Sequence, residues 1–222
     1  MSRKIYYHFL SPENAIDDLK NKRIKISTLD SLNDPFELLP NLKYEYKERQ
    51  TYHKIRRAIS GKWGFLCFSE TWEEPLLWSH YACHHKGIAL GFEITNHELV
   101  KVKYTEDPIR TQIELTDNQK ENEELFLQLA KIKYKKWEYE DESRLLVQLD
   151  DCVQIKSSYF IPFEENLKLT EIRLGAKYNY GASPTIIKEL AKELSAKIIP
   201  SRLEWQGYKI RRDGGERSRK FA

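Results

Sequence analysis

The chain has 222 residues, of which 40% are hydrophobic and 12% aromatic, and this is enough apolar material for one packed domain. Its 37 basic and 34 acidic residues leave a net charge of +3, which gives no general reason to expect nucleic acid or an anionic membrane as a partner. Three irregularly spaced cysteines imply no disulfide framework. With no signal peptide and no long apolar run, we expect a cytoplasmic protein without a membrane partner.

The first half of the chain predicts short strands that alternate irregularly with helices. A strand is expected over 4–9, and Ser11 and Pro12 are then typical of an N-cap and a first helical residue. A strand over 23–28 and a turn over 32–37 follow. The further predicted elements are a charged helix over 43–59, a buried strand over 64–69, a helix over 75–85 and a buried strand over 87–94.

The second half predicts one long helix and then mostly strands. Residues 118–137 carry Leu125, Leu129 and Ile132 at helical spacing. The remaining predicted elements are strands over 143–149, 159–163 and 169–174, a helix from Ser183 and Pro184 to Ser195, and strands around Ile198 and Tyr208. We expect one α+β domain over 1–210, with a central mixed, largely antiparallel sheet and flanking helices, and a basic tail over 211–222.

Two polar segments stand at the ends of predicted elements. In Asn33–Glu37 (NDPFE), Asn33 or Asp34 can bond the backbone of a turn that Pro35 fixes, or Asp34 and Glu37 can lie at the rim of a cleft. Ser69 leaves a buried strand, where a polar residue either lines a pocket or begins a loop.

A third segment, Leu77–Ala82, groups Trp78, His80 and Tyr81. These side chains could stack on and bond a flat heterocycle, or Trp78 and Tyr81 could pack into the core. His80 and His84 have the spacing of two metal ligands on a helix, but Tyr81 stands where a zinc protease has its glutamate, and we expect no metal site.

A fourth segment runs from Trp137 to Arg144. In an extended chain Glu140, Glu142 and Arg144 share one face. They form either an ion-pair ladder on the surface or a site at which arginine tunes a carboxylate. The motifs of dinucleotide folds, P-loops, nucleophile elbows and paired-cysteine zinc sites are absent from the sequence.

Taken in order, these motifs resemble the bacterial family called domain of unknown function 2971 (DUF2971). The matching segments are NDPFE, CFS (67–69), LWSHYA (77–82) followed by HKG (85–87), WEYEDESR (137–144) and IRLG (172–175). Members of this family occur near bacterial and phage-conflict genes, so the resemblance implies a defence or toxin role.

A second resemblance is to ADP-ribosyltransferases, through the opening strand–helix–strand and the E-x-E of Glu140 and Glu142. It implies an ADP-ribosyltransferase-like fold and NAD, or another nucleotide, as substrate. In these terms His8 would hold the ribose or the nicotinamide amide and Tyr81 would stack on nicotinamide. Glu142 would be the catalytic carboxylate, and Glu140 would orient the nucleophile of an acceptor, which could be nucleic acid or protein.

Two other functions fit the same residues. The first is a metal-dependent nuclease in which Asp34, Glu37, Glu140 and Glu142 bind cations and Arg144 lies near the phosphate. The second is a ligand-binding module of a defence system, without catalysis, whose pocket consists of Trp78, His80 and Tyr81. An NAD-consuming transferase or glycohydrolase remains the leading expectation.

Overall fold

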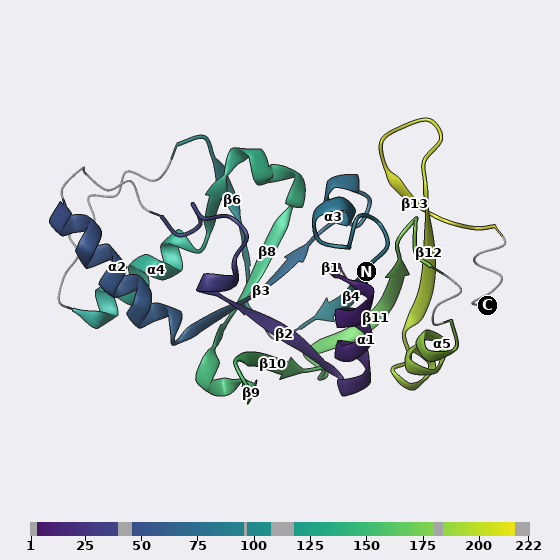
Figure 1. The fold of residues 1–222 in the computed structure, drawn as a ribbon, viewed down its shortest axis with the longest axis horizontal. Coiled ribbons are helices and arrows are strands. Elements are labelled where there is room, and N and C mark those ends of the chain that lie inside the picture. Colours follow the sequence, from purple (N-terminus) through teal and green to yellow (C-terminus); the bar gives the residue numbers. More distant parts are fainter. Residues whose placement is uncertain (1–3, 40–45, 96, 108–117, 180–183, 216–222) are drawn as a thin grey trace.

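The computed structural model describes residues 4–39, 46–95, 97–107, 118–179 and 184–215, and it is an α+β fold with helices flanking one large, mostly antiparallel sheet (Figure 1). The strands of this sheet are β1 (Ile5–Leu10), β2 (Arg23–Thr28), β3 (Trp63–Ser69), β4 (Ile88–Ile94), β5 (Leu99–Lys101), β8 (Glu142–Gln148), β9 (Val153–Ile155), β10 (Ser158–Pro162), β11 (Leu167–Leu174), β12 (Lys197–Leu203) and β13 (Ile210–Arg212). The fold class predicted from the sequence is therefore confirmed.

The sheet forks at β3. Its main path runs β13-β12-β11-β4-β1-β3-β2-β10-β9, and only the β11–β12 pairing within it is parallel. One edge of β3 pairs with β8 from Trp63 to Ser69. The other edge pairs with β2 near Phe65 and with β1 only at Ser69. Strands β1 and β2 therefore diverge beside the middle of β3, and backbone groups there need other partners.

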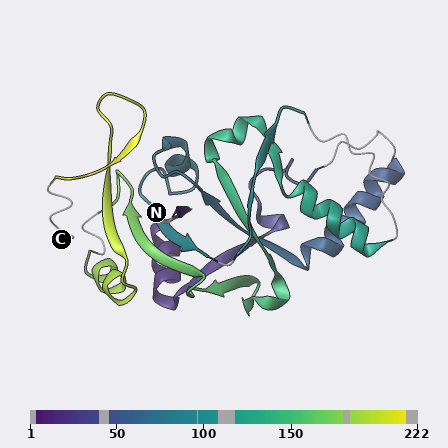
Figure 2. The ribbon, with the colours of Figure 1, turned by 180° about the vertical axis from the view of Figure 1, so that it is seen from behind.

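Helix α1 (Pro12–Asn21) packs on central strands of the sheet, and the other long helices lie toward the two ends of the molecule (Figure 1). Helix α1 begins as the sequence predicts, because the Ser11 hydroxyl accepts a hydrogen bond from the Asn14 amide at 3.3 Å. Helices α2 (Tyr46–Ser60) and α4 (Gln119–Leu129) pack together at one end of the molecule, while α5 (Pro184–Glu193) lies beside β12 at the other (Figures 1 and 2). Residues 43–45 of the predicted charged helix lie outside the described residues, and so does Ser183, the predicted cap of the last helix.

The predicted helix over 75–85 is too long. Helix α3 (Pro75–His80) ends early because Cys83, His84 and His85 have φ values of 46°, 54° and 69°, which a right-handed helix cannot contain. The chain turns there to bring Gly87 against Gly175, whose amide donates to the Gly87 carbonyl at 3.0 Å. A Cβ atom on Gly175 would lie 2.2 Å from the His85 carbonyl oxygen, so this close crossing requires glycine.

The predicted helix over 118–137 is also wrong in its second half. After α4, the chain forms β7 (Ile132–Tyr134), which pairs in parallel with β6 (Lys103–Thr105), and then the 3₁₀ helix η2 (Lys135–Glu140). Two shorter 3₁₀ helices are η1 (Leu29–Ser31) and η3 (Leu149–Asp151). As a result Ile132 belongs to a strand, and its neighbour Lys133 points toward the interior.

The C-terminal predictions need two corrections. Arg211 and Arg212 belong to β13, so the sheet extends into the segment predicted as a tail, and residues 216–222 lie outside the described part. The strand expected around Tyr208 is instead an exposed loop between β12 and β13, in which this side chain is 98% exposed. Within the described residues no helix is long and apolar enough to span a membrane.

Candidate active site

The fork between β1 and β2 opens into a pocket of about 370 Å³. Its walls come from β1, β2 and β3, from the turn after η1, from the end of α3 and from the segment between β7 and β8. It gathers residues that lie more than a hundred positions apart in the chain. The residues predicted from the sequence that line it are His8, Asn33, Asp34, Glu37, Ser69, Tyr81, Glu140 and Glu142.

Glu142 is held in place by Arg144 at the inner wall of the pocket. The guanidinium donates from Nε to Oε1 at 2.7 Å and from Nη2 to Oε2 at 2.9 Å. Arg144 also forms an ion pair with Glu37 and donates to the Ala130 carbonyl at 3.0 Å. Since Arg144 is 0% exposed and does not line the pocket, it positions carboxylates and has no surface for a substrate.

Lys133, which no sequence motif indicates, completes the cluster. Its ammonium lies 2.5 Å from Glu140, 3.1 Å from Glu142 and 3.3 Å from Glu37. Although burial lowers the pKa of Lys133, the three carboxylates outweigh that effect and raise it well above its usual value. The predicted helix over 118–137 includes Lys133, but α4 ends at Leu129 and Lys133 lies in β7, from which it points inward.

The two glutamates of the E-x-E motif have opposite pKa shifts. Burial alone would raise the pKa of Glu142, but Arg144 and Lys133 lower it well below its usual range. Burial raises the pKa of Glu140, and the charge of Glu142 adds to this, while Lys133 opposes it. The site therefore holds one carboxylate that stays ionised beside one that binds a proton more readily, a division typical of acid–base sites.

His8 occupies the gap that the diverging strands leave beside β3. Its Nδ1 lies 2.8 Å from the Cys67 carbonyl oxygen, which neither β1 nor β2 reaches. Because a carbonyl only accepts, Nδ1 carries the proton, and Nε2 is left as an acceptor in the pocket. Burial lowers the pKa of His8, so the ring is neutral near pH 7.

Tyr81, directly after α3, brings an aromatic ring and a hydroxyl to the pocket. The hydroxyl donates to Glu140 at 2.5 Å, and burial together with the charge of Glu140 raises the pKa of Tyr81, so it remains a donor. Burial raises the pKa of the Cys67 thiol well above its usual value, and the charge of Glu142 adds to this. Tyr104 accepts from the Glu142 amide at 2.8 Å and fixes the start of β8.

Both sequence readings of the NDPFE segment hold. Asp34 accepts a hydrogen bond from the Phe36 amide at 2.9 Å, as expected of an Asx turn, and Asp34 and Glu37 also line the pocket. Ser69 behaves in the same way: its hydroxyl accepts from the Thr71 amide at 3.2 Å while its side chain faces the pocket.

Trp78 and His80 do not line the pocket. Trp78 is fully buried behind it, where its indole donates to the Trp72 carbonyl at 2.6 Å and its ring packs edge-on against Phe9 at 5.2 Å. His80 lies on the exposed side of α3, with Nδ1 2.8 Å from the Tyr139 hydroxyl, whose pKa burial raises to about 12. The prediction that Trp78, His80 and Tyr81 form one recognition pocket is therefore wrong, because only Tyr81 lines the pocket.

The metal-ligand geometries considered from the sequence do not form. His84 has a positive φ and lies beyond α3, so it is not one helical turn from His80. Across the described residues no three histidine, cysteine, aspartate or glutamate side chains are grouped so that they could hold a metal ion. The carboxylates of Glu37, Glu140 and Glu142 are bridged by the ammonium of Lys133.

No protein-family model matches the chain, and neither a curated protein nor a solved structure does.

Proposed function

We propose that the pocket binds NAD and breaks the bond between nicotinamide and ribose, as an ADP-ribosyltransferase or an NAD glycohydrolase does. The observation that carries the proposal is the meeting of four side chains in one pocket: His8 from β1, Tyr81 from just after α3, Glu140 from η2 and Glu142 from β8. The resemblance to ADP-ribosyltransferases assigns substrate binding and catalysis to these four residues, and it implies an ADP-ribosyltransferase-like fold. The resemblance to DUF2971 adds the proposal that the enzyme is a bacterial or phage-conflict effector.

The charge of the cluster suits the chemistry. When the bond breaks, its electron pair leaves with nicotinamide, whose ring nitrogen loses its positive charge, and the ribose carbon becomes cationic. The buried charged side chains comprise the four carboxylates of Asp34, Glu37, Glu140 and Glu142 against the two cations Lys133 and Arg144. A fixed negative excess of this kind stabilises a cationic sugar without reorganising during the reaction.

The individual side chains have complementary roles in this scheme. The His8 Nε2 accepts a hydrogen bond from the nicotinamide amide or a ribose hydroxyl, and the Tyr81 ring packs against nicotinamide. Glu142, kept ionised by Arg144, is the carboxylate that faces the developing cation. The attacking water or acceptor hydroxyl loses its proton to Glu140, whose raised pKa suits a general base.

The test is nicotinamide release from NAD by the purified protein. Glu142→Gln and Glu140→Gln should each lower the rate by at least about a hundredfold. Glu140→Gln leaves the ion pairs of Arg144 in place, so it guards against misfolding of Glu142→Gln, and thermal unfolding of both variants confirms the fold. Asp150→Asn, at an exposed acid in η3, is the matched control.

Three results would count against the proposal. The first is that the wild-type protein releases no nicotinamide, with or without candidate protein and nucleic-acid acceptors. The second is full activity of Glu140→Gln and Glu142→Gln. The third is that NAD does not bind in a direct titration. Cleavage of nucleic acid that a chelator abolishes would favour the nuclease instead.

A further inference from the structure

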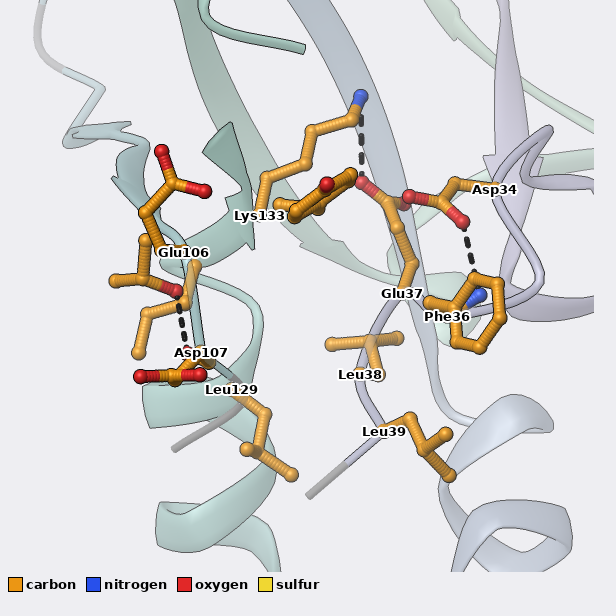
Figure 3. A pocket seen from close by; sticks show the side chains of 12 residues that line it. Asp34, Phe36, Glu37, Leu38, Leu39, Glu106, Asp107, Leu129 and Lys133 are labelled. Carbon is orange, nitrogen blue, oxygen red and sulfur yellow. Dashed lines mark hydrogen bonds and ion pairs between the residues drawn. The ribbon is translucent and has the colours of Figure 1, made fainter. Parts of the chain in front are cut away.

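A second pocket of about 290 Å³ adjoins the first. The two share Asp34, Glu37 and Lys133, which form the boundary between them. Figure 3 shows the turn from Asp34 to Leu39 as one wall and Glu106, Asp107 and Leu129 as the opposite wall. The volume is close to the lower end of the range for small-molecule sites, roughly 300–1,000 Å³.

The walls of this second pocket are apolar, and several of their side chains are unusually exposed. Phe36 is 70% exposed, Tyr134 45% and Leu39 40%, and Leu38, Leu129 and Ile132 continue the surface inward. Adjacent apolar side chains left open in a concave site gain stability when an apolar ligand covers them.

Four acidic residues line the second pocket, namely Asp34, Glu37, Glu106 and Asp107, against one basic residue, Lys133. Glu106 and Asp107 at its rim form no ion pair within the described residues. Lys133 is already bound by three carboxylates and cannot neutralise them as well. The electrostatic potential of the pocket therefore disfavours binding of a phosphate or a carboxylate and favours binding of a cation.

Asp34 supplies a specific group for that cation. The residue is only 7% exposed, and its Oδ1 accepts the Phe36 amide at 2.9 Å. Among the described residues nothing donates to Oδ2, although the side chain lies at the wall of both pockets. Because Oδ2 is accessible to solvent, a ligand in the pocket can donate to it without displacing a protein partner.

We propose that the second pocket binds a small organic cation with an apolar stem, such as an alkylammonium or arylalkylammonium ion. The ammonium donates to Oδ2 of Asp34, and the stem lies against Phe36, Leu39 and Leu129. Neither NAD nor turnover enters the argument, so the inference stands or falls independently of the reaction in the first pocket.

The test is titration calorimetry with phenethylammonium, and with phenethyl alcohol and 3-phenylpropionate as neutral and anionic probes of similar shape. The ammonium should bind at least about tenfold more tightly than the alcohol, and the carboxylate most weakly. Asp34→Asn retains the Oδ1 acceptor of the turn, so it should reduce ammonium affinity about tenfold while leaving alcohol affinity unchanged. Asp150→Asn should change neither affinity.

Equal affinity for the ammonium and the alcohol would overturn the proposal, as would unchanged ammonium affinity in Asp34→Asn. Leu39→Asn provides a second check, because loss of the apolar wall should weaken both the ammonium and the alcohol. Binding that is insensitive to both variants would place the cation elsewhere and reject the site.

Discussion

Arg144 binds both carboxylate oxygens of Glu142, through Nε at 2.7 Å and Nη2 at 2.9 Å, along one face of β8. Side chains two positions apart in a strand point to the same side, so the spacing alone predicts that Glu142 and Arg144 are neighbours. What the spacing did not show is that the same guanidinium also reaches Glu37, from a turn more than a hundred residues earlier. The pair is therefore a structural centre as well as part of the pocket wall.

Arg144→Met should lower the free energy of unfolding by about 3–5 kcal/mol, because Glu37 and Glu142 would remain buried without their partner. Urea denaturation measures the change. Glu193→Gln is the control, since it breaks the exposed pair with Lys22 and should cost about 0–1 kcal/mol. An unfolding midpoint of Arg144→Met equal to that of the wild type would show that the buried network is not formed.

Lys133→Met should shift the acid limb of the pH–rate profile for nicotinamide release to higher pH. Lys133 lowers the pKa of both Glu140 and Glu142, so without it each carboxylate takes up a proton at higher pH and stops stabilising a cation. Lys135→Met, which removes a surface pair with Glu138, should leave the profile unchanged. The same acid limb in both variants would contradict the charge arrangement.

Strand positions were predictable because most of them follow from local burial. The segments 23–28 and 64–69 match β2 and β3 to within one residue, since their apolar side chains pack into the sheet. The end of α4 was not predictable in this way. The apolar residue Ile132 continues the helical spacing, yet it lies in β7, because pairing with β6 is a long-range contact that periodicity does not register.

The site was partly predictable for a related reason. Polar residues at the ends of elements, such as Asn33, Ser69 and Glu142, have no role in a core and did converge on the pocket. Trp78 was misplaced because an aromatic side chain serves a core and a ligand equally well. Lys133 was not predictable, because a lysine within a predicted helix is expected to be solvated. Its role follows only from its buried ion pairs with Glu140 and Glu142.

Tyr81→Phe should separate the hydroxyl from the ring. It removes the donor to Glu140 and leaves that carboxylate with Lys133 as its hydrogen-bond donor, so the rate constant for nicotinamide release should fall about tenfold or more. The ring is kept, so KM for NAD should change little, whereas Tyr81→Ala should raise KM as well. Steady-state kinetics of both variants make the comparison. Equal KM values for the two would remove the stacking role.

Asp18 predicts a stability change with pH that does not involve the pocket. It is buried in α1 with Oδ2 lacking a partner among the described residues, and burial, helped by the charge of Asp17, raises its pKa from 3.8 to about 7. Between these two values the folded state keeps a proton that the unfolded state releases. Its contribution to stability is therefore full below about pH 4 and is lost as the pH rises toward 7.

Asp18→Asn removes this titration. We take the difference in unfolding free energy between the variant and the wild type at pH 4 as the reference. As the pH rises, this difference should change in favour of the variant, by at most about 4 kcal/mol at pH 8. Urea midpoints at pH 4, 6 and 8 measure the difference, in which all other titrating groups cancel. Asp150→Asn, at an exposed acid in η3, should show no such gain. A constant difference between Asp18→Asn and the wild type across this range would mean that Asp18 is already ionised at pH 4.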